Sequence, residues 1–456
     1  MKRLLTILDQ FFFERVSASG FGLMRILWAG TALAFLLGSA PDIIRYWSDA
    51  GILPRNLGYL VFRNEYRFTL LDTFTEPLPV LLLWCTYVTT LFCTLFGIWT
   101  RTMTVSAVLL MFSFHERNLQ PLGGGDTLLR NIGFILMIAP EIDAFSMDRL
   151  ERQWKYWWDT GKLLPALKTH IWPYRLLLWQ FLIIYSTSLW DKLQGTMWLD
   201  GTTVAAIFHH THFFRWPKLL SDLLSFFSPY VCFTFLVYEA TWLLLLVPRN
   251  IWWVLPERVR KHSLKRWILC GGIFFHGTIA LLMDVGTFSF AMFTGYTGLL
   301  LERDFAVLKN IANGWWLRKT RNYTRETNGK ISVLYDGDCR LCTRSIFTLI
   351  LLNHLGRLSP VDFRNAASRK RFAPDIALGD LDRAMHIRMP DGTTLSGFDA
   401  FRRMTWHLPA LWPLAPVLSL PGVPTIGRKV YAVITANRKR CVEGTCAKDE
   451  NARRTP

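Results

Sequence analysis

Two cysteines separated by two residues stand in the stretch VLYDGDCRLCTRS, which begins at Val333. If the chain turns into a helix at this point, Cys339 and Cys342 lie about one turn apart. Two thiols at that distance can form a reversible disulfide, or they can supply half of the ligands of a zinc ion. The stretch therefore predicts either dithiol–disulfide exchange or metal binding.

The residues on both sides of the cysteines predict a strand followed by a helix. Before them, KISVLYDG alternates and then runs apolar, as a buried strand does. After them, LCTRSIFTLILLNHLG has apolar residues at helical spacing and ends at Gly356, a residue type favoured at helix C-termini. We therefore expect the cysteines at a strand-to-helix turn, where unpaired backbone N–H groups and the helix dipole stabilise an anion.

This position predicts different roles for the two thiols. A thiolate at a helix N-terminus is stabilised and can attack a disulfide. We expect Cys339 to be the exposed nucleophile, and we expect Cys342 to lie beneath it and to resolve the mixed disulfide. Asp336 is the third candidate, either as a proton acceptor or as a cap of the helix.

The remaining C-terminal residues predict a small α/β domain over 331–456. The further elements are a strand in LSPVDFRN, short helices in AASRKRFA and IALGDLDRA, a hairpin in MHIRMPDGTTLSG, and helices in FDAFRRMTWHL and TIGRKVYAVITANRKR. The order βαβ followed by ββα is the thioredoxin-type arrangement, so we expect a thioredoxin-like fold.

Three other interpretations of this domain stay open. A zinc site could use Cys339, Cys342, Cys441 and Cys446, because Cys-x2-Cys and Cys-x4-Cys are acceptable spacings for four ligands. The domain could also dock partners while its thiols are incidental. Finally, VLYDGD could present a nucleophilic Asp at a strand end, as in a phosphatase, with LGDLD holding a cation.

The rest of the chain has the composition of a membrane protein. Of its 456 residues 51% are hydrophobic, 20 are Trp, and the net charge is +18. Trp favours the membrane–water boundary, and much of the positive charge lies in short loops between apolar runs, as in membrane proteins. No basic stripe or recognition motif indicates a nucleic-acid partner. The cysteines in the apolar runs stand singly and read as core residues; they are Cys85, Cys93, Cys232 and Cys270.

Eight apolar runs within residues 1–301 predict a multi-pass α-helical membrane bundle with about eight crossings. The candidate crossings are 21–40, 78–98, 102–115, 127–140, 173–190, 227–247, 267–283 and 287–301. Ahead of them, the amphipathic N-terminus predicts a helix that lies in the membrane interface. Behind them, residues 302–330 are basic and polar, which is typical of a juxtamembrane linker.

The distribution of charge between the loops predicts an orientation. The loops predicted on the same side of the membrane as the N-terminus carry more Lys and Arg than the loops on the opposite side. We therefore expect a bacterial-type inner (plasma) membrane protein with both termini in the cytoplasm. Structural disulfides rarely persist in that compartment. A Cys-x-x-Cys motif there is expected to be catalytic, redox-sensing or metal-binding.

Two segments of the membrane part are unusually polar. Asp126 follows three glycines in HERNLQPLGGGDTLLRN, where it could cap a helix or mark a close approach of the backbone to a ligand. Lys192 lies at the outer end of the fifth predicted crossing. A Lys partly buried in apolar surroundings can act as a base, whereas a Lys at a helix end can also extend its charge into water.

The stretches DKLQGTMWLDGT and LGGGDTLLRNIGFILMIAP resemble the horizontally transferred transmembrane (HTTM) family, which is related to vitamin K-dependent gamma-glutamyl carboxylase. The resemblance covers most of residues 10–300. It implies that Lys192 acts as a base and that a quinone-like or lipid ligand binds nearby; Leu193, Trp198 and Gly201 are similar to the rest of the carboxylase motif. Asp126 stands where the carboxylase uses a His, so the resemblance does not extend to gamma-carboxylation.

The stretches YDGDCRLCTRS, MHIRMPDGTTLSGFDAF and YAVITANRKRCVEGTC resemble the DCC family of thiol-disulfide oxidoreductase-like proteins. The resemblance covers about residues 331–446 and rests on the DxxCxxC core at Asp336, Cys339 and Cys342. It implies that the two cysteines are catalytic. One departure from thioredoxins is that no proline directly precedes MHIRM, where a cis-proline would help to bind the substrate.

Together these patterns predict a membrane-anchored thiol-disulfide oxidoreductase that requires no cofactor. Its expected partners are the lipid bilayer and a protein or small molecule that carries a thiol or a disulfide. The competing prediction is a transporter, or a lipid- or quinone-binding membrane protein, whose C-terminal tail senses redox state or binds zinc.

Overall fold

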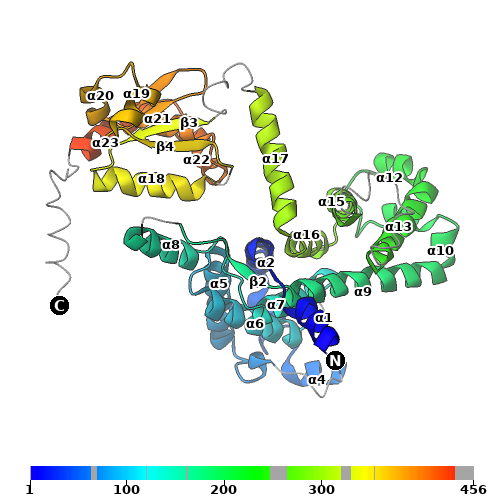
Figure 1. The fold of residues 1–456 in the computed structure, drawn as a ribbon. Helices are drawn as coiled ribbons and strands as arrows, with labels where there is room; N and C mark the ends of the chain where they lie inside the picture. Colours follow the sequence, from blue (N-terminus) through cyan, green and yellow to red (C-terminus); the bar gives the residue numbers. More distant parts are fainter. Residues whose placement is uncertain are drawn as a thin grey trace. The chain divides into compact units, whose positions relative to one another are not determined.

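The computed structural model describes residues 2–62, 69–119, 121–160, 163–246, 264–319, 330–353 and 355–436. The chain divides into two compact units, Met1–Phe305 and Ala306–Pro456 (Figure 1). The first unit is helical, and the second contains a four-stranded sheet. We describe each unit by itself.

Within the described residues, the helical unit consists of helices and of a two-stranded antiparallel ladder, β1–β2. Its elements are α1 (Lys2–Phe13), β1 (Arg15–Ser17), α2 (Ser19–Gly38), α3 (Ile43–Trp47), α4 (Arg55–Phe62), α5 (Pro77–Phe96), α6 (Thr100–Arg117), α7 (Gly124–Ile138), α8 (Met147–Thr160), β2 (Lys168–His170), α9 (Trp172–Gln194), α10 (Thr196–Leu199), α11 (Thr203–Phe208), α12 (Lys218–Ser225), α13 (Ser228–Leu243), α15 (Leu264–Leu282) and α16 (Phe288–Gly298).

Every predicted crossing falls on a helix of this unit, but the helices differ in their capacity to span a bilayer. Among the described residues, three are long and apolar enough: α2, α5, and α13 with the turn that continues it to Leu246. Helices α7 and α16 have only 15 and 11 residues, whereas a crossing needs roughly 20. The arrangement of eight crossings and the orientation derived from it therefore stay predictions.

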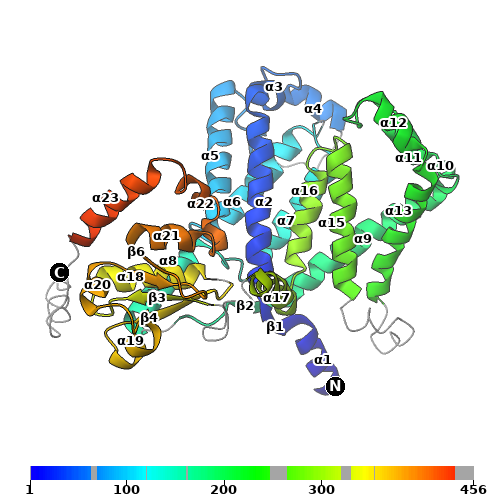
Figure 2. The same cartoon turned by 90° about the horizontal axis from the view of Figure 1, so that it is seen from above.

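Helices α5, α2, α16 and α15 lie side by side in Figure 2. Their shared core contains Trp28, Leu91 and Met292, which are fully buried. Small residues permit the close approach: a Cβ at Gly298 would lie 2.4 Å from the sulfur of Met24. Packing through small residues is the usual way in which helices associate when both are surrounded by apolar groups.

A buried arginine joins three parts of the helical unit. Arg25 in α2 is fully buried, and the acceptors of its guanidinium among the described residues are backbone carbonyl groups. The acceptors are the carbonyls of Thr94 and Leu95 at the end of α5, and those of Ile142, Ala144 and Phe145 in the segment before α8. Arg25 thus satisfies carbonyls that a helix terminus leaves without an intrahelical donor.

The second unit begins at Ala306, within helix α17 (Glu302–Lys319), which crosses the boundary between the units. Its further elements are β3 (Ile331–Tyr335), α18 (Arg340–Leu352), β4 (Leu358–Asp362), α19 (Ala366–Phe372), α20 (Leu378–Arg383), β5 (His386–Arg388), β6 (Thr394–Ser396), α21 (Gly397–Thr405), α22 (Leu414–Val417) and α23 (Val423–Ala436).

The sheet has the strand order β4-β3-β5-β6. Strand β3 pairs parallel with β4 and antiparallel with β5, and β5 pairs antiparallel with β6. Side chains alternate between the two faces of the sheet. Ile331 and Val333 pack with α18 and α21 on one face, whereas Leu334 packs with residues of α20 and with Phe363 on the other. The result is a mixed sheet covered on both faces.

Within the described residues, the strands and helices predicted for this domain are confirmed, with one correction at the end of α18. Residues 437–440 of the last predicted helix lie outside the described residues. The helix stops at Leu352, and Asn353 rather than Gly356 follows it as the cap residue. The Asn353 side chain accepts from the backbone N–H groups of Arg357 and Leu358 at 2.8 and 3.1 Å. Asn therefore organises the turn, and Gly356, with φ +67°, supplies its left-handed residue. Of the predicted linker, 302–319 is helix α17, and 320–329 lie outside the described residues.

We expect Arg25→Met to lower the free energy of unfolding by about 3 kcal/mol or more, because it leaves several buried carbonyls without donors. Thermal unfolding of the full chain in detergent measures this loss. The matched control is Arg45→Met, since Arg45 is exposed and makes a surface pair with Asp42 three residues earlier; its cost should stay under about 1 kcal/mol. Equal losses for the two variants would refute the role assigned to Arg25.

Candidate functional site

The two cysteines occupy the turn between β3 and α18. Cys339 is the cap residue of α18, and its sulfur accepts a hydrogen bond from the backbone N–H of Cys342 at 3.3 Å. The loop closes behind it, because the N–H of Cys339 donates to the carbonyl of Asp336 at 3.3 Å. The predicted strand-to-helix position is confirmed, and a backbone donor points at the sulfur of the first cysteine.

The exposure of the two thiols is the reverse of the prediction. Cys339 is fully buried, whereas Cys342 is partly exposed and lines a pocket. The physical reason is the cap geometry: a side chain that folds back to accept an N–H of the first turn is covered by that turn. In the reduced state of this structure, Cys342 therefore presents the accessible sulfur.

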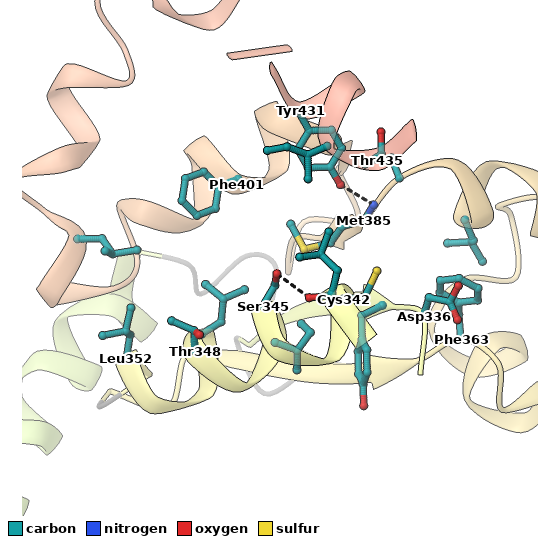
Figure 3. Close-up of a pocket in the computed structure, with 18 residues that line it drawn as sticks. Asp336, Cys342, Ser345, Thr348, Leu352, Phe363, Met385, Phe401, Tyr431 and Thr435 are labelled. Atoms are coloured by element: carbon teal, nitrogen blue, oxygen red, sulfur yellow. Dashed lines mark hydrogen bonds between the residues drawn. The ribbon is translucent and has the colours of Figure 1, made fainter. Parts of the chain in front are cut away.

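An apolar pocket of about 450 Å³ lies beside Cys342 (Figure 3). One wall is α18, with Cys342, Thr348 and Leu352 along it, and the other side carries Phe401 of α21 and Tyr431 of α23. This volume is within the range of small-molecule sites in proteins. The pocket gives Cys342 an apolar, partly enclosed approach.

Helix α23 is fixed to the edge of the pocket by its tyrosine. The hydroxyl of Tyr431 accepts a hydrogen bond from the backbone N–H of Met385 at 3.0 Å. Met385 directly precedes β5, and the residue before it, Ala384, stands where the sequence lacks the proline of thioredoxins. The backbone N–H of Met385, which lies beside the pocket, therefore has its hydrogen-bond acceptor within the protein.

Asp336 forms a buried, two-point ion pair with Arg364. The Arg364 Nε and Nη2 atoms donate to the two carboxylate oxygens at 2.8 and 2.7 Å, and Asp336 is 2% exposed. Hydrogen bonding to Asp336 raises the pKa of the Arg364 guanidinium above its ordinary value. The interpretation of Asp336 as the cap of α18 is wrong, because Cys339 occupies that position and Asp336 faces Arg364.

The same arginine also pairs with two further acidic residues, one in the turn and one in α20. Arg364 also contacts Asp382 at 2.7 Å and Asp338 at 3.7 Å. Asp362 joins the two loops, since its Oδ1 accepts from the N–H groups of Gly337 and Arg364 at 3.1 and 2.9 Å. The Arg364 guanidinium therefore occupies the place proposed for a cation beside VLYDGD and LGDLD. The phosphatase interpretation requires a metal ion at this place, so the arrangement does not support it.

Sequence reasoning missed Arg364, although a signal for it was present. Strands β3 and β4 are parallel, and Tyr335 pairs with Asp362 in the register. The residues after the two strands therefore emerge next to each other, so that an acid after one and a base after the other can pair.

The zinc interpretation stays open. Cys441 and Cys446 lie outside the described residues. Within the described part of the chain, no group of three or more His, Cys, Asp or Glu side chains could hold a metal ion. Two of the four proposed ligands, Cys339 and Cys342, do lie together, since the backbone N–H of Cys342 donates to the sulfur of Cys339.

Asp126 has a structural role at the start of α7. Its Oδ2 accepts from the N–H of Gly123 at 2.8 Å, so this side chain reaches back to the cap residue as the third helical residue of a capping box does. Its Oδ1 accepts from the hydroxyl of Thr287 at 3.1 Å, just before α16. The helix-capping interpretation of Asp126 is supported, with Gly123 as the cap residue itself.

Lys192 is paired inside the helical unit. Its Nζ lies 2.6 Å from both the Glu239 carboxylate of α13 and the Ser188 hydroxyl one turn earlier, and 5.0 Å from the ring centre of Trp198. Glu239 is 3% exposed and was missed by sequence reasoning, because its partner lies 47 residues away. A role for Lys192 as a base remains a prediction.

Comparison with known proteins identifies the C-terminal part of the chain. A family model described as DCC1-like thiol-disulfide oxidoreductase matches residues 333–443. An uncharacterized chloroplastic protein of Arabidopsis thaliana is 30% identical over 156 residues, which cover 30% of this chain and 71% of that protein. No solved structure matches the chain. The resemblance of the helical unit to the HTTM family stays a prediction.

We expect a small alkylating reagent to modify Cys342 roughly tenfold or more faster than Cys339, because reaction requires an accessible thiol. Peptide mass spectrometry of the native, reduced chain after short exposures measures the two rates. Unfolding the chain before alkylation should make the rates similar. Faster labelling of Cys339 would contradict the assignment of the accessible sulfur.

We expect Arg364→Met to destabilise the second unit by about 3–5 kcal/mol, because it leaves the buried Asp336 carboxylate unpaired. The control is Arg388→Met, whose partner Asp375 is 56% exposed and which should cost under about 1 kcal/mol. Hydrogen exchange of the amides of β3 in the full chain reports both losses. Similar exchange rates in the two variants would show that the Asp336–Arg364 pair is not essential.

Proposed function

From the premise that the C-terminal part of this chain belongs to the DCC1-like thiol-disulfide oxidoreductase family, we propose that it exchanges disulfides through Cys339 and Cys342. One observation carries the proposal. A backbone N–H is directed at the buried sulfur of Cys339, while Cys342 opens onto a pocket. One thiol is thus placed to bear negative charge and the other to meet a substrate.

The architecture supports a thioredoxin-like fold for this unit. The elements β3-α18-β4 and β5-β6-α21 follow the predicted order, and the strand order β4-β3-β5-β6 places the two parallel strands together. Helices α18 and α21 share one face of the sheet, and α20 packs on the other face. In such a fold the strand-to-helix turn carries the redox cysteines.

The geometry assigns the two sulfurs to different steps. With Cys339 and Cys342 oxidised, an incoming thiolate attacks the accessible Cys342 sulfur, the disulfide breaks, and Cys339 leaves as a thiolate. The N–H of Cys342 stabilises the charge that develops on the leaving sulfur. A second substrate thiolate then attacks the substrate sulfur of the mixed disulfide, that bond breaks and Cys342 leaves as a thiolate, so the pair takes up two electrons and two protons and the substrate thiols become a disulfide. In the opposite direction, Cys339 attacks the Cys342 sulfur of the mixed disulfide and expels the substrate thiolate.

The surroundings of the site restrict its substrates. Beside Cys342 the pocket is lined mainly by Leu, Ile, Phe and Tyr side chains, so we propose thiols or disulfides with an apolar group next to the sulfur. The three helices able to span a bilayer would anchor this chemistry to a membrane. The orientation predicted from the loop charges places the thiols in the cytoplasm.

The proposal is tested with the full chain in detergent, equilibrated in glutathione buffers of graded potential. Cys339 and Cys342 should interconvert reversibly between dithiol and disulfide near the cytosolic potential, as counted by thiol-specific mass tags. Cys339→Ser should accumulate a glutathione adduct on Cys342, whereas Cys270→Ser, in the helical unit, should behave as the parent protein.

Metal content is measured on the same samples. Stoichiometric zinc with four protected thiols would replace the oxidoreductase proposal by a zinc site. Thiols that stay reduced at every potential, without zinc, would leave the domain as a docking module.

A further inference from the structure

Large apolar side chains are exposed on one segment of the second unit. Among the described residues from 330 onward, Leu341 and Leu378 are the exposed large hydrophobic side chains that precede residue 406. The others lie within residues 406–434, and they include Val417, the last residue of α22, and Leu420. Exposed apolar groups that gather in one region mark a site of interaction with a partner or a membrane. This segment therefore presents a surface that requires an apolar cover.

Helix α23 is apolar on two sides. Its inner side carries Tyr431, which lines the pocket of the redox site and accepts the N–H of Met385. The outer stripe of α23 consists of Ile426, Val430 and Val433, which are 64%, 52% and 62% exposed. Their spacing of four and three residues places these side chains on one side of a helix. The unit does not cover this stripe, and α23 lies at the edge of the unit in both Figure 1 and Figure 2.

The contact between α21 and α23 carries excess positive charge. Arg402 and Arg403 of α21 and Arg428 of α23 line a common hollow of about 520 Å³. Asp399 is the acid in this lining, and it pairs with Arg402 at 3.3 Å and with Arg428 at 3.1 Å. Three guanidinium groups thus share one carboxylate. Guanidinium groups bind phosphate oxygens through charge-assisted hydrogen bonds, so the hollow suits the phosphate of a lipid headgroup.

Two half-exposed tryptophans stand at the start of the same segment. The indole N–H of Trp412 donates to the backbone carbonyl of Trp406 at 3.1 Å, so the two residues lie together. Trp406 also lines the basic hollow. Tryptophan is enriched at the boundary between lipid and water, where its ring contacts apolar groups and its N–H remains near polar ones. The side chains around α23 therefore have the composition of a membrane-surface contact.

The charge of this segment distinguishes a lipid surface from a second copy of the chain. Residues 397–436 contain four Lys and Arg residues and a single acid, Asp399. In a symmetric dimer the same surface of each copy meets the other, so Arg403 and Lys429 would approach their own equivalents. Like charges that face each other across an interface cost free energy. An anionic lipid surface instead attracts these basic groups.

The rest of the chain brings this surface near a bilayer. Helices α2 and α5, and α13 with its continuation to Leu246, are long and apolar enough to span a membrane. A domain tethered to such helices meets the lipid surface at a high effective concentration. The loop charges predict that the second unit is cytoplasmic, and the cytoplasmic leaflet is the one that carries anionic lipids. The apolar and the basic groups thus find complementary partners in the same place.

We propose that the second unit docks on the surface of the bilayer through the outer stripe of α23. The stripe enters the boundary between headgroups and acyl chains, as an amphipathic interfacial helix does. Lys429 and the basic hollow contact the phosphates of anionic lipids. The docking requires no thiol chemistry, so it stands apart from the proposed function of the cysteines.

The test uses the full chain reconstituted in nanodiscs of phosphatidylcholine mixed equally with phosphatidylglycerol. A photoreactive benzoyl-phenylalanine replaces Val430 in one sample. In the control sample it replaces Lys370, which is exposed in α19; Phe372 of that helix packs on the opposite face of the sheet from α21. After irradiation, mass spectrometry identifies the captured molecule. Position 430 should capture about tenfold more lipid than position 370, because a docked stripe lies within reach of acyl chains.

The captured molecule distinguishes the possible occupants of the stripe. Lipid at position 430 and little at position 370 supports the docking. Capture of a second copy of the chain, or of another part of the same chain, would overturn it. Equal lipid capture at the two positions, or no capture at position 430, would overturn it as well.

A second set of variants examines the apolar contact. Ile426→Gln with Val433→Gln should lower lipid capture at position 430 by about tenfold, because it makes the stripe polar. The matched control is Leu378→Gln, an exposed apolar residue of α20 outside the segment, which should leave capture unchanged. Hydrogen exchange of the β3 amides verifies that each variant is folded. Undiminished capture in the first variant would contradict the role of the stripe.

A third set examines the anionic lipid. Arg403→Gln with Lys429→Gln should lower lipid capture at position 430 by about threefold or more in the mixed nanodiscs, since two basic groups near the lipid surface are removed. The control, Lys370→Gln with Arg371→Gln, removes the same charge from α19 and should have little effect. In nanodiscs of phosphatidylcholine alone, the two variants should capture equally. Equal capture in the mixed nanodiscs too would refute the recognition of anionic headgroups.

Discussion

The ion pair between Asp336 and Arg364 organises the redox turn. Asp336 directly follows β3 and Arg364 follows the neighbouring parallel strand β4, so one bidentate contact fixes the ends of both strands. Asp336 also accepts the N–H of Asp338 at 3.1 Å and thereby shapes the loop that leads to Cys339. Removing one member of such a pair leaves a buried charge uncompensated. The position of the first thiol therefore depends on a contact made by neither cysteine.

As a consequence, two sulfurs only three residues apart differ in their exposure and in their hydrogen bonds. The cap position buries Cys339 and directs a backbone N–H at its sulfur, and the first turn of α18 places Cys342 at the pocket. A disulfide between them would be open to attack from one side only. In the proposed exchange, this geometry selects Cys342 to form the mixed disulfide and Cys339 to carry the charge when the bond breaks.

The helical unit uses polar groups differently. Arg25 satisfies carbonyls at the end of α5, and Asp126 accepts the N–H of the cap residue Gly123 at the start of α7. Lys192 and Glu239 form a pair in which Glu239 is almost fully buried. Among apolar helices, charged side chains are expensive and are found paired with each other or with backbone groups. The first two residues serve the helix ends, and the third has a partner that links α9 to α13.

The sequence by itself determined the local structure of the C-terminal unit: strand, turn and helix around the cysteines, and the order of the elements that follow. These features depend on residues close in the chain, through hydrophobic periodicity and turn chemistry. Only the tertiary structure decided which thiol is exposed, that Arg364 rather than a helix end holds Asp336, and that Glu239 pairs with Lys192. Each depends on side chains that are distant in sequence or on the covering of one element by another, and no local pattern records such contacts.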